Sequence, residues 1–507
     1  MGKGDKGKRR TIISLLLIAA TALLIYSNIF SSPFLFDDKR NIVDNDEIRS
    51  LSNFWPPSGT RYAGYLSFAI NFYFGGLDVS GYHLVNIVIH IINGILVWRL
   101  ISLTFETPRM KTGGISRLKG FIALTSALIF VAHPIQTQAV TYIVQRFASL
   151  ATLFYLLSLV LFIKGRLSLI THHSRLKTIL YISASLFSAI LAMKTKEISF
   201  TLPFVIALYE FMFFGSNPPS LLSSSLATRS RLLYLIPFLI PLLVIPLSMV
   251  GVNKPLGDII GDIDEFARMA ANGISRGTYL LTQFRVIVTY IRLLFFPIGQ
   301  NLDYDYPLSN SFFEFKVFFS FIFLLSIFCL AIYLFIRSRR GNNGYALLVS
   351  SGILWFFITL SVESSIIPIE DVIFEHRLYL PSVGAIIAFS AALFYILDHA
   401  RLKVSPLTVT CVLLLLTALP LSIAAYNRNL VWRDDVTLWK DVVRKSPAKA
   451  RAHYNLGVAY DDKGQIEEAK KEYRKALGLR PDHNLGSAYY NKVWWVSTLN
   501  GSTQGTL

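Results

Sequence analysis

Stretches of about twenty consecutive apolar residues recur along most of this 507-residue chain and constrain its fold more than any other feature. A helix needs about twenty apolar residues to cross a bilayer, so each stretch predicts a membrane span. With 53% hydrophobic and 16% charged residues, the chain is too apolar for a soluble protein. We expect an all-α polytopic membrane protein with about 11 transmembrane helices. They fall at residues 11–30, 83–105, 121–138, 147–163, 178–194, 198–214, 232–250, 314–336, 345–362, 381–397 and 405–426.

The basic residues predict the orientation of these spans. Lys and Arg gather in short segments between the apolar stretches, so the net charge of +18 indicates cytoplasmic loops rather than a nucleic-acid-binding surface. The chain begins with basic residues, and no clear small-residue cleavage site follows its first apolar stretch. This pattern predicts an uncleaved first span. Eleven crossings from a cytoplasmic N-terminus place the C-terminus outside. The basic segments that then fall inside are 3–10, 99–119, 164–177, 229–231, 337–340 and 401–403.

Two further segments predict helices on the outer membrane surface. Residues 279–298 are apolar, but a crossing there would move the arginines at 337–340 outside. Arg285 and Arg292 are seven residues apart and share one helix face. We expect an interfacial or re-entrant helix, with a true span as the alternative. Residues 54–78 are amphipathic and punctuated by Pro and Gly, which also predicts interfacial helices.

Beyond residue 426 the composition becomes charged and helix-forming. Residues 449–482 have the 34-residue spacing of a tetratricopeptide repeat, two antiparallel helices with small residues at their crossing. Residues 437–447 predict the second helix of a preceding repeat, while 485–489 depart from the pattern. An array this short needs a neighbour to cover its faces. We therefore expect it to pack on the membrane domain. We divide the chain into a membrane domain, 1–430, and a repeat domain, 431–507. The landmarks of the repeat are Asn455, Leu456, Gly457, Tyr460, Gly464, Ala469, Tyr473, Ala476, Leu477 and Pro481.

The most unusual charges are Asp37 and Asp38, which follow directly after the first span in a chain with few acids. Such a pair is commonly a solvated loop, and it also suits a catalytic base with an orienting partner. Other polar residues fall on the same outer side under this topology, which favours a single polar cavity there. For the histidines the alternative is an internal hydrogen bond, and for Arg146 and Lys196 it is a lipid-headgroup contact. The remaining residues are His83, Asn86, His90, His133, Gln136, Gln138, Lys194, Glu197, Asp303, Tyr304, Asp305, Glu363, Glu370, Asp371, Glu375, His376, Arg377 and Tyr379.

Motifs for metals and nucleotides are lacking in the sequence. His133 has no second His at i+4, and Cys329 and Cys411 lie in predicted spans, so we expect neither a zinc site nor a disulfide. There is no GxxxxGK[ST] loop and no His-Glu-x-x-His. Two carboxylates supply too few oxygen ligands for a hard cation, so we expect no cofactor and no metal requirement, with a divalent ion as the alternative.

Carboxylates beside Arg, Lys and His at the outer membrane surface suit a lipid-phosphate sugar donor. Its tail can lie between spans, its phosphate can pair with cations, and its sugar can meet the carboxylates. One Asp can take the proton of an acceptor hydroxyl while cations stabilise the leaving phosphate, which describes an inverting transfer.

Several spaced blocks of the sequence carry a resemblance to a known family. The blocks are Phe36-Asp37-Asp38, Gly81-Tyr82-His83-Leu84-Val85-Asn86, His133-Pro134-Ile135, Lys196-Glu197 and Arg377-Leu378-Tyr379-Leu380-Pro381. Together and in this order they resemble the transmembrane and tetratricopeptide-repeat (TMTC-like) O-mannosyltransferases of the GT-C glycosyltransferase superfamily. The resemblance covers nearly the whole chain, although this chain has about one clean repeat where family members commonly have many.

The resemblance implies transfer of a hexose, in this family mannose, from a dolichyl- or polyprenyl-phosphate donor to Ser or Thr of proteins on the luminal or outer side. It implies a catalytic acid in the pair, with Asp37 as base and Asp38 as orienter, and the opposite assignment remains open. The candidate contacts for the donor phosphate and sugar are Arg61, His83, Asn86, His90, His133, Arg146, Lys196, Glu197, His376, Arg377 and Tyr379.

Two rival functions remain open. One is transfer of a sugar or oligosaccharide to a lipid or glycan such as lipid A or O-antigen. The other is a non-catalytic membrane scaffold whose repeats recruit partners. The expected partners of the enzyme are the lipid-linked donor, membrane lipids and a protein acceptor held by the repeats, with no nucleic acid. The chain length and a single Asn-x-Ser/Thr site at Asn500 favour a bacterial inner membrane, with an undecaprenyl-phosphate hexose as donor, over the endoplasmic reticulum.

Overall fold

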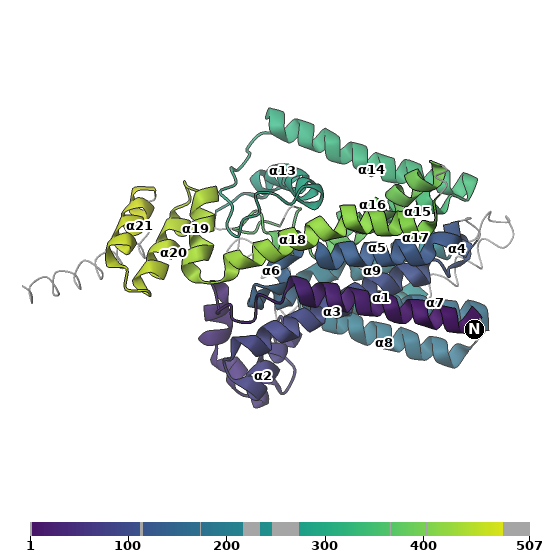
Figure 1. Cartoon of the computed structure of the whole chain (residues 1–507), viewed down its shortest axis with the longest axis horizontal. Coiled ribbons are helices and arrows are strands. Elements are labelled where there is room, and N and C mark those ends of the chain that lie inside the picture. The colour runs from purple at the N-terminus through teal and green to yellow at the C-terminus, as the bar shows by residue number, and fades with distance from the viewer. Residues whose placement is uncertain are drawn as a thin grey trace, which may run out of the picture.

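The structure is a computed structural model, and within the residues it describes every regular element is a helix, so the predicted all-α fold is confirmed. Figure 1 shows a bundle of helices along the long axis of the molecule and a short helical domain beyond one end of the bundle, which we call the repeat end. The described residues are 3–111, 115–172, 174–215, 234–245, 273–365, 367–400 and 404–479.

The predicted spans overlap the helices of the bundle, several of which extend beyond the predicted bounds. By length and hydropathy alone, six of the described helical segments can cross a membrane, and a seventh can if one bent pair is counted as a single span. The span expected at 232–250 is described only over 234–245, where a short 3-10 helix, η8 (Ile236–Leu243), lies. The bundle helices are α1 (Lys3–Ile25), α3 (Val79–Thr104), α5 (Lys119–Ala132), α7 (Arg146–His172), α8 (Arg175–Met193), α9 (Leu202–Phe213), α14 (Phe315–Gly341), α15 (Gly344–Leu360), α16 (Pro381–His399), α17 (Pro406–Leu416) and α18 (Ala418–Asn429).

The bent pair lies at the repeat end, where α5 stops at His133 and the chain turns by 52°. Pro134 has no N–H to continue a helix and keeps the preceding residue extended, so the break follows from the sequence. The His133 ring then accepts the Ile135 N–H at 3.1 Å and starts the next turn. The short elements η5 (Pro134–Gln136), α6 (Thr137–Val140) and η6 (Ile143–Gln145) carry the chain to α7.

The two segments expected on the membrane surface are helical. α13 (Arg276–Phe295) is seen nearly end-on in Figure 1, whereas α14 extends along the bundle. This crosswise direction fits an interfacial helix, and α13 does not meet the length and hydropathy criteria for a span. The first segment forms α2 (Tyr62–Gly75), preceded by η1 (Lys39–Val43), η2 (Asp46–Arg49) and η3 (Leu51–Phe54).

The bundle core depends on one very close helix contact. Gly352 of α15 and Gly384 of α16 face each other, and a Cβ on either would lie 2.3–2.5 Å from the carbonyl oxygen of the other. Only glycine allows the two backbones this close, which is how small residues serve at helix crossings in membranes. Two 3-10 helices lead into bundle helices: η9 (Glu375–Leu378) precedes α16, and η7 (Glu197–Thr201) precedes α9.

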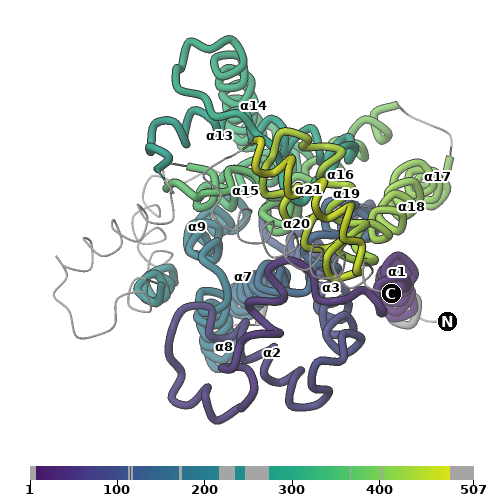
Figure 2. The backbone as a smooth tube through the Cα atoms, turned by 90° about the vertical axis from the view of Figure 1, so that its left-hand side faces the viewer, coloured from purple at the N-terminus to yellow at the C-terminus, as the bar shows by residue number. Residues whose placement is uncertain are grey.

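The C-terminal helices form the predicted repeat. α20 (Ala450–Asp461) and α21 (Ile466–Leu479) pack as a pair, with a Cβ at Gly457 only 2.5 Å from the Tyr473 ring. α19 (Asp435–Lys445) is the helix expected from a preceding repeat, and η10 (Leu430–Trp432) joins it to α18. Figures 1 and 2 show these helices covering the repeat end of the bundle, as expected for an array too short to stand alone.

Some predicted features lie outside the described residues. They are the basic segments 229–231 and 401–403, Pro481, the irregular unit at 485–489 and the glycosylation site at Asn500.

Gly352→Ala should lower the free energy of unfolding by about 1–3 kcal/mol, because the added methyl group meets backbone that cannot move without separating two helices. Gly120→Ala on α5 is the matched control, since nothing lies within 4 Å of a Cβ there. Thermal unfolding of the detergent-purified protein measures both. Equal melting temperatures for Gly352→Ala and wild type would contradict the close contact.

Candidate active site

The loop after α1 is fixed by the carboxylate of Asp38. This side chain is 1% exposed and accepts two backbone N–H groups, from Leu35 at 3.0 Å and from Val144 at 2.7 Å. Val144 belongs to the turn that leads into α7, so Asp38 joins the end of the first helix to the start of another. This geometry suits an orienting role for Asp38, whose oxygens are occupied by the fold.

The carboxylate of Asp37 lies beside this anchor and is only half-buried. Its backbone N–H donates to the Tyr142 hydroxyl at 3.0 Å, and the Tyr142 ring stacks on Trp432 at 5.2 Å. Burial raises the pKa of Asp37 above its ordinary value, while the Tyr142 hydroxyl and the positive charge of Arg451 oppose the rise. Asp37 is therefore the accessible carboxylate of the pair.

Burial also raises the pKa of Asp38, to about 8, against the lowering effect of the N–H groups of Leu35 and Val144. The negative charge of Asp37 adds to the rise. At neutral pH the pair thus favours one negative charge, which Asp37 holds more readily because it is nearer to water.

A second group of sequence-predicted residues forms what we call the cationic cluster: Arg61, Lys196, Glu197, Glu363, His376 and Arg377. Arg61 makes a two-pronged ion pair with Glu197, at 3.0 and 3.2 Å. Lys196 binds Glu363 at 2.9 Å, and both side chains are less than a tenth exposed. Arg377 is 3% exposed and donates to the carbonyl oxygens of Asp371 and Val372.

His376 shows that these charges surround one place. Burial lowers the pKa of its imidazole far below the ordinary value, and the charges of Lys196, Arg377 and Arg61 lower it further. The ring stacks on Phe374 with centroids 5.0 Å apart, and within the described residues its Nδ1 is buried without a hydrogen-bond partner. A neutral imidazole with a free ring nitrogen can accept or donate a hydrogen bond to a bound molecule.

The other predicted residues lie inside the bundle and bond to the protein. The Arg146 guanidinium is fully buried and donates to Asn86 at 2.6 Å, to Asn71 at 2.7 Å and to the Tyr82 carbonyl at 3.0 Å. Its hydrogen-bonding capacity is therefore used within the fold. The remaining pairs are His83 with the Ser32 carbonyl at 2.9 Å, His90 with the Tyr379 hydroxyl at 2.7 Å, and His133 with the Leu294 carbonyl at 2.9 Å. The contact of these residues with a donor stays a prediction.

Sequence reasoning missed the cations that the repeat contributes. Arg451 makes a two-pronged ion pair with Asp303 at 2.8 Å and a second pair with Asp371 at 2.6 Å, and Lys449 also binds Asp303. The partners of Arg451 are 80 and 148 residues away in the chain. The repeat periodicity predicts that Arg451 lies on the first helix of the repeat, but it does not predict which way the side chain faces. No sequence signal therefore identified Arg451 as part of the site.

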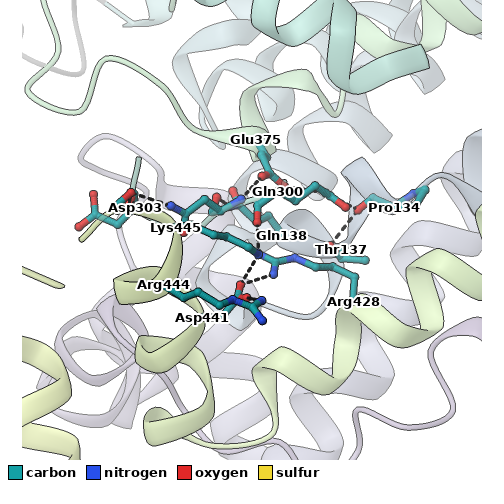
Figure 3. Close-up of polar contacts among 12 residues, drawn as sticks. Pro134, Thr137, Gln138, Gln300, Asp303, Glu375, Arg428, Asp441, Arg444 and Lys445 are labelled. Carbon is teal, nitrogen blue, oxygen red and sulfur yellow. Dashed lines mark hydrogen bonds and ion pairs between the residues drawn. The ribbon is translucent and has the colours of Figure 1, made fainter. Parts of the chain in front are cut away.

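Figure 3 shows the seam between the repeat and the bundle. Glu375 is fully buried and accepts from the Gln300 side chain at 2.7 Å, the Asn301 N–H at 2.6 Å and the Tyr304 hydroxyl at 2.6 Å. On the repeat side, Lys445 donates to the Gln300 carbonyl at 2.6 Å and to Asp441 at 2.5 Å. Glu375 precedes His376 in the chain, so the seam fixes the element that carries part of the cationic cluster.

Within the described residues, no group of three or more His, Cys, Asp or Glu side chains is arranged to hold a metal ion. Cys329 and Cys411 are both exposed and unpaired with each other.

Comparisons with known proteins agree with the resemblance seen in the sequence. A family model of the tetratricopeptide repeat matches residues 450–483. The chain is 23% identical to a protein of Caenorhabditis elegans named Protein O-mannosyl-transferase F38B6.6, over 94% of this chain and 64% of that one. It is 26% identical to human Protein O-mannosyl-transferase TMTC1, over 93% and 56%, and 24% identical to human TMTC4, over 90% and 65%. No solved structure matches.

The similarity to TMTC O-mannosyltransferases is thus confirmed over nearly the whole chain. The chain spans only about three fifths of the length of the curated relatives it matches.

Asp38→Asn should lower the free energy of unfolding by about 1–3 kcal/mol at mildly acidic pH, because the amide NH2 faces one of the two buried N–H donors, whereas the hydroxyl oxygen of protonated Asp38 can still accept. The pKa of Asp38 in the fold, about 8, lies above its unfolded value, so the stability that protonated Asp38 contributes is lost as the pH rises toward 8. The deficit of the variant should therefore shrink over that window. Chemical denaturation across pH measures it, with Asp37→Asn as control. A constant deficit at every pH would show that folded Asp38 does not titrate there.

Proposed function

We propose that this protein is an inverting glycosyltransferase that moves mannose from a polyprenyl-phosphate donor to Ser or Thr hydroxyls of proteins. One observation carries the proposal: the half-buried carboxylate of Asp37 and the cationic cluster are both linked to the segment at Asp371, at the repeat end of the bundle. The names of the relatives support the sugar and the acceptor class. The donor class and the stereochemistry are supported by the chemistry of the site alone.

The segment at Asp371 connects the two parts of the site. Its backbone carbonyl accepts from Arg377 at 2.7 Å, and the charge of its carboxylate acts on the pKa of Asp37. We place the phosphate of the donor near Arg377 and its sugar on the side of Asp37. This arrangement is what an in-line displacement requires, with the base and the leaving group on opposite sides of the anomeric carbon.

The transfer is one displacement step in which atoms and charge balance. Asp37 takes the proton of the acceptor hydroxyl, and the hydroxyl oxygen forms a bond to the anomeric carbon. The bond from that carbon to the phosphate oxygen breaks, and polyprenyl phosphate leaves with the electron pair. The proton on Asp37 is later lost to water. The Tyr142 hydroxyl bonded to the Asp37 backbone holds the base in place.

The cationic cluster stabilises the leaving phosphate. Arg61, Lys196 and Arg377 carry three positive charges, and Glu197 and Glu363 carry two negative ones, so one positive charge remains. The buried Glu363 oxygen that has no partner within the described residues, and the free Nδ1 of His376, can accept donors from the sugar. Negative charge that develops on the leaving phosphate is thus stabilised by a pre-formed, mostly buried positive site.

We further propose that the repeat end faces the outer or luminal side, with the N-terminus in the cytoplasm. The basic loops of the sequence support this orientation. The bacterial inner membrane stays a prediction from the sequence.

Metal independence is expected because both oxygens of Asp38 already accept N–H groups, which leaves Asp37 short of partners for a hard cation. Transfer by the purified enzyme should continue at an unchanged rate after EDTA treatment. Loss of activity with EDTA and recovery with Mg²⁺ or Mn²⁺ would show instead that a divalent ion takes part.

Asp37→Asn should abolish transfer, because the amide cannot accept the hydroxyl proton. Mass spectrometry of intact outer-facing proteins, from cells with wild type, a deletion or the variant at equal expression, should show hexose-sized increments in wild type only. Asp44→Asn, an exposed acid in the same loop, is the matched control and should retain the increments.

Unchanged protein masses in all strains would reject protein as acceptor, and hexose missing from the lipid extract of the deletion would then point to a lipid or glycan. Increments that persist in Asp37→Asn would reject Asp37 as the base.

Replacing the buried ion pair with neutral side chains tests the phosphate contact. Lys196→Met with Glu363→Gln leaves no unpaired buried charge, so the fold should persist. Loss of one charge-assisted contact to phosphate should raise KM for polyprenyl-phosphate mannose about 10- to 100-fold. Steady-state kinetics with the purified donor measures this, and an unchanged KM would place the phosphate elsewhere.

A further inference from the structure

Arg451 of the repeat lies next to the loop after α1 that carries Asp37 and Asp38, which we call the acidic loop. Arg451 lies on α20, yet its guanidinium is 5.9 Å from the centroid of the Phe36 ring, and Phe36 directly precedes Asp37. The same guanidinium binds Asp303 and Asp371 at 2.6–2.8 Å. One side chain of the repeat therefore touches the acidic loop and two acids of the membrane domain.

The repeat also holds the acidic loop from other positions. Phe36, with a backbone φ of 50°, packs its ring edge-on against Trp439 of α19, with centroids 5.3 Å apart. Lys39 on the loop pairs with Asp435 at 3.3 Å and lies 3.6 Å from Asp462. A left-handed conformation at a non-glycine residue costs about 1 kcal/mol or more and persists only where packing determines it. The repeat supplies part of that packing.

The charged and hydrogen-bonding groups that face Asp37 come from four segments. Asp38 and Arg40 lie on its own loop, the Tyr142 hydroxyl comes from the turn before α7, Asp371 comes from the segment before η9, and Arg451 comes from α20. Asp371 disfavours a charged Asp37, while Arg451 favours it and neutralises Asp371 through a direct ion pair. The electrostatic field at Asp37 thus depends in part on a residue of the repeat.

We propose that Arg451 is a positioning residue of the transfer reaction: by binding Asp371 and lying over Phe36, it keeps the base Asp37 ionised and oriented. This inference rests on the proposed function, and it assigns to the repeat a part in completing the active site, in addition to any contact with acceptor proteins. A role in docking alone predicts that loss of Arg451 changes only the amount of folded enzyme.

Two variants that break the same ion pair separate these roles, because they change the charge near Asp37 in opposite directions. Arg451→Gln removes a cation and leaves Asp371 with a longer ion pair to Lys449, at 3.9 Å. Asp37 should then hold its proton to higher pH. Asp371→Asn removes an anion and leaves Arg451, so Asp37 should release its proton at lower pH. Each should move the acidic limb of the rate-against-pH profile by roughly half to one pH unit, upward for Arg451→Gln and downward for Asp371→Asn.

The rate is measured with purified protein in nanodiscs, dolichyl phosphate carrying labelled mannose as donor, and membrane proteins of the deletion strain as acceptors. Arg451→Lys should restore the wild-type limb, because it returns the charge. Lys463→Gln, which breaks the ion pair with Asp434 elsewhere in the repeat, should leave the limb unchanged. If the acidic limb of the rate-against-pH profile is the same for Arg451→Gln, Asp371→Asn and wild type, the proposal is overturned and Arg451 has only a docking role.

A second measurement needs no catalysis and keeps the inference separate from the proposed function. Carbodiimide couples glycine ethyl ester to protonated carboxyl groups, and peptide mass spectrometry gives the extent of coupling at Asp37 across acidic to neutral pH. Coupling should extend about half to one pH unit higher in Arg451→Gln and fall correspondingly lower in Asp371→Asn. If these shifts appear while wild type transfers no mannose, the proposed function fails and the effect of Arg451 on Asp37 stands. Coincident coupling curves would overturn the inference even if transfer is found.

Discussion

The buried carboxylate of Asp38 is the contact on which the candidate active site depends. It accepts the N–H groups of Leu35 and Val144, so the loop after the first helix and the turn before α7 are joined at one side chain. An unsatisfied buried N–H costs about as much free energy as a lost hydrogen bond, so both segments are held in one arrangement. That arrangement leaves Asp37 half-buried, with its backbone N–H bonded to the Tyr142 hydroxyl.

The acidic loop is also part of a core shared with the repeat. Leu35, Ile42 and Tyr142 from the membrane domain pack in one hydrophobic cluster with Trp439 and Leu456 from the repeat helices. Polar contacts surround this cluster, among them the seam of Figure 3. Buried ion pairs contribute little net stability because desolvation offsets the attraction between the charges, but they specify which surfaces meet. The hydrophobic cluster therefore provides the affinity between the two parts, and the ion pairs provide their register.

Patterns that extend over many residues predicted the fold well. Apolar stretches located the bundle helices and 34-residue spacing located the repeat, because each depends on local geometry. The predicted span 121–138 ran through Pro134 and missed the bend of 52° that follows α5. Individual polar residues were harder to interpret. His90 looks the same in sequence as His376, yet His90 bonds within the bundle while His376 keeps a free ring nitrogen within the described residues. Whether a buried polar group is satisfied depends on tertiary neighbours, as does the meeting of Arg451 with Asp303 across 148 residues.

The central claim is geometric: the base and the cations lie on opposite sides of one bound sugar. A cryo-electron microscopy structure of the full chain in nanodiscs, with a non-hydrolysable phosphonate analogue of polyprenyl-phosphate mannose, tests it most directly. The account predicts the phosphonate among Arg61, Lys196 and Arg377, with the anomeric carbon facing the side of Asp37. A phosphonate bound away from these cations, or an anomeric carbon that Asp37 and an acceptor hydroxyl cannot reach together, would contradict the account.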